Sequence, residues 1–419
     1  MEGKRKDNFI YEFVRARWFM KITIIASLFL SVLLAMGIFP IMAKEGVKIA
    51  VLTDQSDVYA GITKSNVDAV KMAVEDFGGK VLGQPIVVLD RDHKNRPGVA
   101  TQKAKELYEK EGVDAIFDVC QSACGLAVSE QANIYKKLFF SVSSGTTEHV
   151  KSACNPYTFD WGYNDYMLAT SAGLWAAENL GKKWYTITAD YAWGHDLLKN
   201  FTAAVEKKGG RVIGNDMVAL GASDFSPYLL KAMNSGAEVL VLLNAGKDII
   251  NSMKQANEFG LTKKMKIVYC LLFEIQVVSV GANVFQDGYT TSPWMWKSPI
   301  PGAREFSEKW YAKYNVRPHF LNAANYSAAL QYLNAVKRAG TKNPKAVIKQ
   351  LEGLKFNDIF AHPGYVRPEN HSCITDAFIV RVKRPAENTE KWDVFQIVDK
   401  VPAEEDYGPP SPECKMPKL

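Results

Sequence analysis

The strongest constraint on the fold is a regular alternation between short apolar runs and longer segments with helical periodicity. Four early runs have the length and composition of buried strands, at residues 47–52, 86–89, 115–119 and 138–142. The segments between them place apolar residues at helical spacing, as at Val67, Val70 and Val74. Strands that alternate with helices pair in parallel, with helices on both faces of the sheet. The alternation therefore predicts a doubly wound, Rossmann-like α/β lobe.

A second alternation of predicted strands and helices follows residues 155–166. This stretch is rich in aromatic residues, also contains Pro and Gly, and interrupts the first alternation. We interpret this stretch as the crossover into a second lobe. Further strands are expected at residues 184–188, 211–217, 239–243 and 266–271. The chain has 419 residues, which is too long for one ordinary core. Two doubly wound lobes are therefore expected.

The last third of the chain suits a return to the first lobe. Helices are expected at residues 303–314 and 323–338, after a proline-rich segment. Residues 375–383 and 392–398 alternate like antiparallel strands, which indicates another crossing between the lobes. A Pro-rich tail closes the chain.

The N-terminus carries a targeting pattern. Six Lys and Arg residues precede an apolar run at residues 22–39, and a small residue stands at Ala43. We interpret residues 1–43 as an export signal; the alternative is a retained membrane anchor, because the run is at the lower edge of spanning length. Beyond residue 43 the chain carries 45 Lys and Arg against 42 Asp and Glu, which does not suggest a nucleic-acid-binding protein.

Two neighbouring loops provide a candidate binding site. The predicted strand 115–119 ends in residues 120–124, and the strand 138–142 ends in residues 143–147. Both loops are rich in small polar residues. At the carboxyl end of a parallel sheet they would lie beside helix N-termini, where free N–H groups attract anions. A carboxylate is the expected ligand; the alternative is that these Ser and Thr residues only cap helices.

Three aromatic side chains could stack on a planar ligand: Trp161, Tyr191 and Trp193. The alternative for them is ordinary packing between the lobes. Metal binding is not expected, because Cys120 and Cys124 have no further His or Cys pair at ligand spacing. Six cysteines in an exported chain permit disulfides, but their spacing leaves the pairing open.

Several stretches together resemble a known family. The most similar are CNPYTFDWGYNDY at residues 154–166, TADYAWGHDLL at 188–198 and NAGKDIINSMKQANEFG at 244–260. With AVEDFGG, AIFDV, SDFSPYLLKA and VKRPAE, they are similar to the type I periplasmic solute-binding proteins of ABC importers. The resemblance is to the branched-chain amino acid (Leu/Ile/Val) family, in a branch associated with aromatic acids. It covers nearly all of the expected exported chain.

The resemblance implies two lobes joined by a multi-strand hinge, with the ligand held between them. The N-terminal lobe would comprise residues 44–162 and 292–372, the C-terminal lobe residues 163–291 and 373–405, and the tail residues 406–419. The residues at the family's ligand-binding positions are Tyr59, Gln121, Ser122, Ser143, Thr146, Thr147, Trp161, Tyr191, Trp193, Asn244, Ala245, Gly246 and Glu274.

Two of the implied assignments concern individual side chains. Glu274 would bind the amine of an amino-acid ligand, although its register differs from the family pattern by about one residue, which leaves an amino-acid ligand open. A disulfide between Cys154 and Cys414 is also implied by this branch.

The expected function is the capture of a small carboxylate, either an aromatic acid or a branched-chain or aromatic amino acid, for delivery to a membrane permease. The protein would be periplasmic, with no cofactor. One alternative is a ligand-sensing receptor domain held by an uncleaved N-terminal segment. An enzyme is not expected, because the six histidines are dispersed and common hydrolase and nucleotide-binding motifs are missing, although a spatial triad of Ser143, His195 and an Asp is left open.

Overall fold

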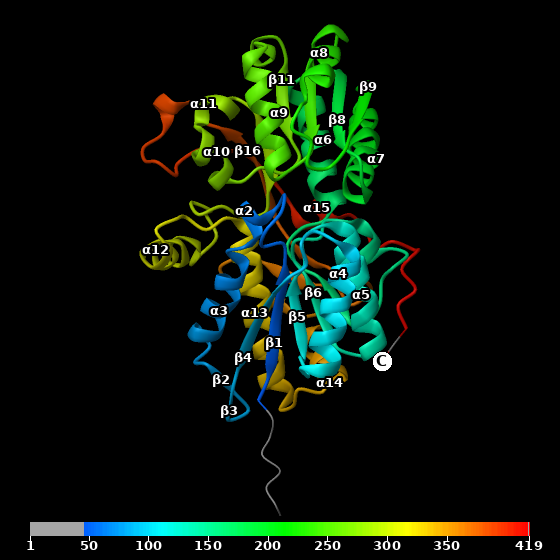
Figure 1. The fold of residues 1–419 in the computed structure, drawn as a ribbon, viewed down its shortest axis with the longest axis vertical. Coiled ribbons are helices and arrows are strands. Elements are labelled where there is room, and N and C mark those ends of the chain that lie inside the picture. The colour runs from blue at the N-terminus through cyan, green and yellow to red at the C-terminus, as the bar shows by residue number, and fades with distance from the viewer. Residues whose placement is uncertain (1–45, 418) are drawn as a thin grey trace, which may run out of the picture. The chain divides into compact units, whose positions relative to one another are not determined.

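Two large β-sheets organise the part of the chain that the structure, a computed structural model, describes, residues 46–417 and 419 (Figure 1). The first has five strands in the order β4-β1-β5-β6-β7, and the second has seven in the order β17-β16-β12-β11-β10-β8-β9. The predicted export signal, residues 1–43, lies outside the described residues.

The first lobe is built on the five-stranded sheet, in which every neighbouring pair is parallel. Its strands are β1 (Lys48–Thr53), β4 (Val87–Asp92), β5 (Ala115–Asp118), β6 (Leu138–Ser141) and β7 (Thr158–Asp160). Its main helices are α3 (Asn66–Asp76), α4 (Pro97–Lys105), α5 (Ser122–Tyr135) and α13 (Phe320–Ala339). The expected parallel, doubly wound arrangement is confirmed.

Smaller elements complete this lobe. They are α2 (Ala60–Thr63), the hairpin β2 (Lys80–Val81) and β3 (Gln84–Pro85), α12 (Ala303–Tyr314), α14 (Pro344–Leu351), and the antiparallel strands β13 (Lys355–Phe356), β14 (Gly364–Val366) and β15 (Cys373–Thr375). A π-helical segment at Glu106–Lys110 continues α4, and a 3-10 turn forms at Thr147–Val150.

The second lobe surrounds the seven-stranded sheet. Its strands are β8 (Lys183–Ala189), β9 (Arg211–Val218), β10 (Val239–Leu243), β11 (Lys266–Tyr269), β12 (Tyr289–Ser292), β16 (Ala377–Val382) and β17 (Phe395–Val401). Its helices are α6 (Asp165–Asn179), α7 (Ala192–Lys207), α8 (Ser226–Asn234), α9 (Lys247–Glu258), α10 (Glu274–Val280) and α11 (Ala282–Phe285), with a 3-10 turn at Leu261–Lys263. The pairs β12–β16 and β16–β17 are antiparallel, as the alternation near the end of the chain predicts.

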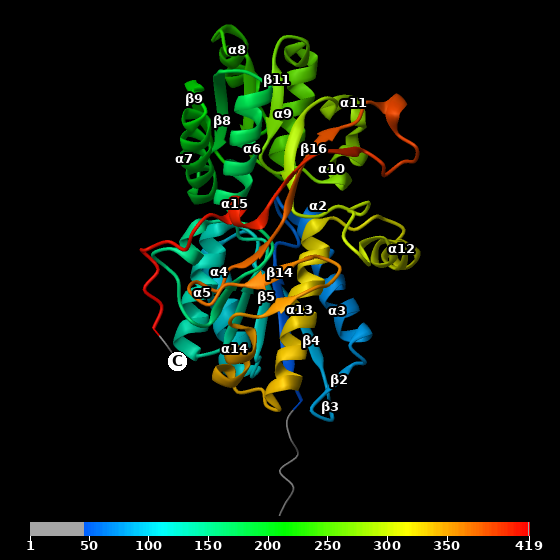
Figure 2. The same cartoon turned by 180° about the vertical axis from the view of Figure 1, so that it is seen from behind.

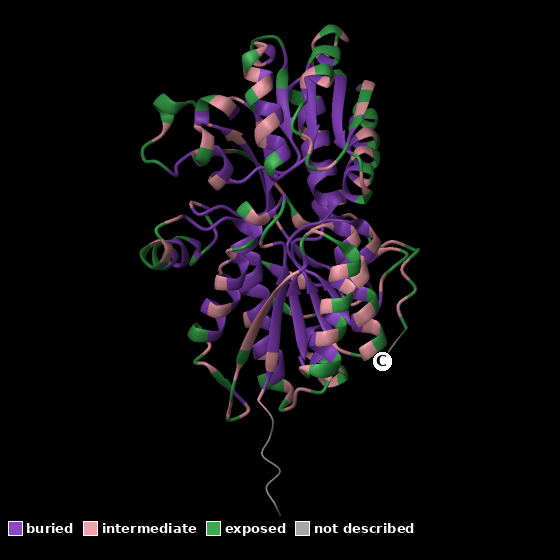
Figure 3. Cartoon of the chain, viewed as in Figure 1, coloured by how far each residue is buried: buried purple, intermediate pink, exposed green. Residues whose placement is uncertain are grey.

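The central strands of both sheets are buried, as Figure 3 shows, whereas the edge strands β4, β9 and β17 are partly exposed. The buried side chains of the central strands are mostly apolar. In the first lobe, Phe117 stacks on Phe140 at a centroid distance of 4.9 Å, and Phe140 stacks on Phe159 at 5.2 Å. Such offset aromatic contacts add to the burial of the rings. Phe159 belongs to β7, so residues 155–166 first complete this sheet and only then cross to the second lobe.

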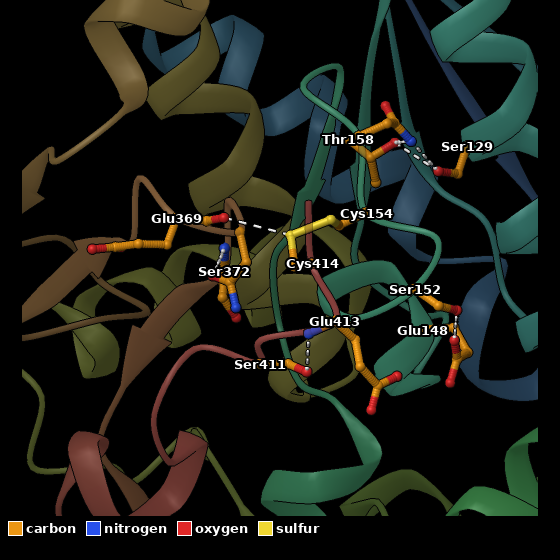
Figure 4. The surroundings of a disulfide bond; sticks show 12 residues. Ser129, Glu148, Ser152, Cys154, Thr158, Glu369, Ser372, Ser411, Glu413 and Cys414 are labelled. Carbon is orange, nitrogen blue, oxygen red and sulfur yellow. Dashed lines mark hydrogen bonds between the residues drawn. A yellow bond between two sulfur atoms is a disulfide. The ribbon is translucent and has the colours of Figure 1, made fainter. Parts of the chain in front are cut away.

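The chain crosses between the lobes after β7, after β12 and between β15 and β16, and the C-terminal segment then returns across the junction (Figures 1 and 2). The return includes α15 (Ala403–Tyr407), which contacts α6 and β15. The predicted disulfide between Cys154 and Cys414 is confirmed, and it fastens the tail to the first lobe (Figure 4). The exact limits of the two lobes stay a prediction.

Candidate functional site

A small cavity lies where the carboxyl ends of the two sheets face each other. It spans about 310 Å³ of space free of atoms, part of which is open to solvent. The predicted residues that line it are Tyr59, Gln121, Ser122, Ser143, Tyr191, Trp193 and Ala245. The lining residues not named among the predicted ligand-binding positions are Ile62, Tyr163, Leu271 and Leu321, together with Cys120 and Gly145 from the two predicted loops.

The loop between β5 and α5 reaches the cavity through an unusual backbone path. Asp118, Val119 and Gln121 all have positive φ angles, of 81°, 58° and 74°. Residues other than glycine rarely adopt this region, and such strain concentrates at functional sites. The loop is held at its end by Gln121, whose Oε1 accepts a 2.7 Å hydrogen bond from the N–H of Cys124 and so caps α5.

Ser122 offers a hydrogen-bond donor to the cavity. Its side chain is buried, and its Oγ has no hydrogen-bond partner among the described residues. Ser122 is also the first residue of α5, so the N–H groups of Ser122 and Ala123 have no carbonyl partner within the helix. The helix end adds a partial positive charge. This corner of the cavity can therefore bind an anion.

Aromatic rings form much of the remaining wall. The hydroxyl groups of Tyr59 and Tyr191, one from each lobe, lie 2.6 Å apart. Tyr191 stacks on Trp193 at a centroid distance of 6.0 Å, and the Nε1–H of Trp193 has no partner among the described residues. Burial raises the pKa values of both tyrosines, which keeps their phenols neutral. This wall is suited to a planar ligand.

Gly145 is required by the closeness of these rings. A Cβ at this position would lie 2.6 Å from Cε2 of Tyr163 and 2.8 Å from Nε1 of Trp193. Tyr163 itself donates a 3.2 Å hydrogen bond to the carbonyl of Ser143 and packs edge-on against Phe320. Tyr163 belongs to the same aromatic stretch as Trp161. Its place in that stretch was the only feature of the sequence that could have indicated a role at the site.

Trp161 lies outside the cavity lining, in the core of the first lobe. Its ring stacks on Phe356 and meets the edge of Phe140, and its Nε1–H donates to Oγ of Ser327 at 3.3 Å. Core packing accounts for these contacts, but within the first lobe and not between the lobes, as the alternative for this residue had it.

Thr146 and Thr147 also do not line the cavity. The Oγ1 of Thr146 accepts a bond from the N–H of Glu148 and so caps a 3-10 turn, the role considered as the alternative for this loop. The N–H and Oγ1–H of Thr147 both donate to Oδ2 of Asp196, at 2.8 and 2.7 Å. Because Asp196 belongs to α7, this pair of bonds connects the two lobes.

The remaining predicted residues of the second lobe, Asn244, Gly246 and Glu274, do not line the cavity. Asn244 donates to Oγ of Ser252 at 3.3 Å, and the carbonyl of Gly246 accepts a 2.8 Å bond from Gln276. Glu274 is buried, with Oε1 lacking a partner among the described residues, and burial raises its pKa to about 8. Glu274 does not line the cavity.

The geometry does not assemble the triad that the sequence left open. Ser143 donates to Asp118, whereas Nε2 of His195 lies 2.8 Å from Oδ1 of the half-exposed Asp190. Within residues 46–417 and 419, no group of three or more His, Cys, Asp or Glu side chains could hold a metal ion. The search of the same residues for a helix long and apolar enough to span a membrane found none.

Comparison with known proteins agrees with the fold. The family model described as periplasmic binding protein matches residues 46–389. A crystal structure of a periplasmic binding protein from Burkholderia mallei is 38% identical and has a TM-score of 0.83, with 86% of this chain and 96% of that chain covered. The periplasmic ligand-binding protein of a branched-chain amino acid ABC transporter from Burkholderia xenovorans is 34% identical, with a TM-score of 0.79 and coverage of 88% and 100%.

Proteins of lower sequence identity are also similar to this chain. A solute-binding protein of an ABC transporter from Rhodopseudomonas palustris, in complex with 3,4-dihydroxybenzoic acid, shares the fold at 22% identity and a TM-score of 0.78, with 85% of this chain and 97% of that chain covered. Leu/Ile/Val-binding protein homolog 6 of Brucella melitensis is 25% identical over 238 residues, 55% of this chain. The chain spans about 60% of the length of that curated relative. The chain belongs to the periplasmic binding protein family.

Proposed function

We propose that the chain is the substrate-binding component of an ABC importer and that it captures a small carboxylate between its two lobes. The observation that carries this proposal is a cavity between the lobes whose two unpartnered donors are Ser122 Oγ–H and Trp193 Nε1–H. Charge-assisted hydrogen bonds from such donors to a carboxylate are stronger than bonds between neutral groups. The transporter role is supported by the relative from Burkholderia xenovorans.

Capture requires the lobes to separate and close. In the arrangement seen here the cavity has room for about one water molecule, so a ligand of the size of benzoate can neither enter nor fit unless the lobes move apart. Closure forms the bonds between Tyr59 and Tyr191 and between Thr147 and Asp196. A ligand that contacts both lobes binds the closed state more tightly than the open one and so shifts the population toward closure.

The cavity wall favours a planar acid over an aliphatic amino acid. Tyr59, Tyr163, Tyr191 and Trp193 present aromatic surface to the ligand, and such surface packs well against another ring. Glu274, the residue expected to bind an amine, lies outside the lining. The complex of the Rhodopseudomonas palustris protein shows that this fold accommodates an aromatic acid.

A thermal-shift panel tests the ligand class. Benzoates, cinnamates and phenylpyruvate would be compared with leucine, isoleucine, valine and phenylalanine. Ligand at about 100 times its Kd adds roughly 2.7 kcal/mol of stability, which raises Tm by several degrees. Benzamide serves as the neutral control for benzoate. An equal shift with the acid and its amide would refute carboxylate recognition, and a shift with the aliphatic amino acids alone would reverse the preference.

Export to the periplasm and delivery to a membrane permease are parts of the same proposal. Cell fractionation with N-terminal sequencing of the mature chain tests export, because cleavage near residue 43 is expected. Retention of the full N-terminus in the membrane fraction would instead support the receptor alternative, which no observation on the described residues favours.

A further inference from the structure

Two carboxyl groups of the second lobe lie against the first-lobe loop at residues 143–147. Asp165 is the first residue of α6, and Asp196 belongs to α7. Oδ2 of Asp196 accepts both hydrogen bonds from Thr147, and its Oδ1 accepts a third, at 3.0 Å, from Nδ2 of Asn200. The N–H of Asp165 donates to the carbonyl of Gly145 at 2.6 Å. The two acids therefore lie at a contact that closure of the lobes forms.

The carboxyl group of Asp165 is fully buried, and the first lobe supplies part of its cover. A Cβ on Gly145 would lie 2.5 Å from Oδ1 of Asp165, so the backbone of the first lobe packs directly against this oxygen. Because Gly145 belongs to the first lobe, separation of the lobes removes this cover and admits water to the carboxyl group.

The hydrogen bonds around the pair show which acid carries a proton. Neither oxygen of Asp165 receives a hydrogen bond from an N–H or O–H group of a described residue. Both oxygens of Asp196 act as acceptors, and one of their donors is the backbone N–H of Thr147, whose role is certain. A bond between the two acids requires a proton, because a carboxylate can only accept. That proton therefore belongs to Asp165.

The electrostatic surroundings agree with this. Burial, the charge of Asp196 and a hydrogen bond to Asp196 hold the pKa of Asp165 well above its usual range. The other titratable side chains that interact with Asp165 are Lys151, Asp160, Tyr163 and Cys270. The acid among them raises the pKa of Asp165 further, and the lysine lowers it. The phenol and the thiol are neutral, because burial raises their own pKa values. Asp406, on α15, bonds instead to Ser171, further along α6.

We propose that the closed protein holds one proton between Asp165 and Asp196, and that this pair is a latch for Thr147, so that capture of the ligand takes up a proton. Asp165 is a positioning residue in the latch: its proton bonds to Asp196 and holds that carboxylate against the two donors of Thr147. The latch rests on the proposed function, because closure around the ligand is what forms it.

Closure and protonation strengthen each other in this arrangement. In the open state Asp165 meets water, where the pKa of an aspartic acid is about 3.9. The closed state holds the proton more tightly than the open state does. Affinity for the ligand is therefore greatest at low pH and falls as the pH rises toward the raised pKa of the closed state. Uptake of one proton per ligand corresponds to a loss of affinity of about 10-fold per pH unit.

Calorimetry measures the proton directly. The tightest-binding acid of the thermal-shift panel would be titrated at about pH 7 in two buffers of different ionisation enthalpy, because the heats then differ in proportion to the protons taken up. We expect wild-type protein to take up about half to one proton per ligand, and its Kd to rise between about pH 6 and pH 8.

Variants assign the proton to its site. Asp165→Asn keeps a donor toward Asp196 but has no titrating proton, so it should bind within about 3-fold of wild type at about pH 6 and take up no proton. Glu274→Gln is the matched control, because Glu274 is another buried acid of the second lobe, and it should keep the wild-type uptake. Thr147→Val removes the Oγ1–H bond to a charged group and should weaken binding about 10-fold. Thermal melting confirms that each variant is folded.

The outcomes distinguish the two proposals, and the wild-type measurement does so without any variant. If wild-type protein takes up no proton and its Kd is constant from about pH 6 to pH 8, the shared proton is overturned while carboxylate binding stands. The same holds if Asp165→Asn keeps the wild-type uptake. Wild-type affinity in Thr147→Val would overturn the latch. If the acids do not bind, or bind no better than benzamide, the proposed function fails, and this inference fails with it.

Discussion

The two lobes contribute different chemistry to the same cavity. The first lobe supplies polar groups on tightly held loops, with Gln121 capping α5 and Ser143 bonded to Asp118. The second lobe supplies Tyr191, Trp193, Ala245 and Leu271, whose surfaces are aromatic or aliphatic. The first lobe therefore contributes most of the polar groups, beside the apolar surfaces of Tyr59, Ile62 and Leu321, and the second lobe contributes mainly surface that can cover a ring, together with the Nε1–H of Trp193.

The difference also concerns how each wall is supported. The hydrogen-bond network around Asp118, which bonds to Asn66 and Asn325, is built from residues of β5, α3 and α13, all in the first lobe. It does not require the second lobe to be in place. Trp193, in contrast, projects from α7 with an unpartnered Nε1–H. This suggests that the ligand first binds a preformed polar wall and that the second lobe then closes over it.

The largest expected effect comes from removing the aromatic wall. Trp193→Ala deletes the ring that stacks with Tyr191 and also a donor. Truncation of a buried aromatic anchor costs about 2–4 kcal/mol of binding energy. Calorimetry with the best aromatic acid should show this loss. Trp193→Phe keeps a ring but removes the N–H, so its affinity should lie between those of wild type and Trp193→Ala. Wild-type affinity in Trp193→Ala would show that this wall does not contact the ligand.

The second prediction compares two buried carboxyls, one in each lobe. Asp118 accepts bonds from three neighbouring side chains, whereas one oxygen of Glu274 has no partner among the described residues. Burial raises the pKa of Glu274 from 4.5 to about 8. The folded protein thus holds this proton more tightly than the unfolded chain does. The stability linked to it is present below about pH 4.5 and is lost as the pH rises through about 8.

Glu274→Gln should therefore be more stable than wild type at about pH 8.5, by about 1–3 kcal/mol, with little difference at about pH 4. Urea unfolding at the two pH values measures this. Glu305→Gln is the matched control, because Glu305 also lies in the first turn of a helix but is exposed. Affinity for aromatic acids should not change in Glu274→Gln. A strong loss of affinity would show that the Glu274 side chain contributes to ligand binding.

Local sequence patterns predicted the sheets better than the site. The runs at residues 115–119 and 138–142 are continuous apolar segments, and both are buried strands. Strand β7 was missed because it lies among Pro, Gly and aromatic residues, where its parallel pairing to β6 gives no local signal. The disulfide was found through the family resemblance, since 260 residues separate its two cysteines.

Within the site, residue type was a good guide to location and a poor one to role. Ser122 and Ser143 are both serines after a strand, yet one hydroxyl has no partner among the described residues and the other donates to Asp118. The amides of Asn66 and Asn325 also donate to Asp118, and they lie in helices far away in sequence. Asparagine in a helix has no distinctive periodicity, so this network could not be predicted.

The smallest predicted effect concerns the contact between the two walls themselves. Tyr59→Phe removes the hydroxyl that lies 2.6 Å from that of Tyr191. A neutral hydrogen bond contributes about 0.5–1.5 kcal/mol, so the affinity for ligand should fall by a factor of roughly 2 to 12. Tyr191→Phe should have the same effect, and the double variant should lose little more than either single one, because both changes remove one bond. Additive losses would instead mean that each phenol binds the ligand directly, which would make the second lobe a polar partner in recognition and weaken the contrast between the two walls.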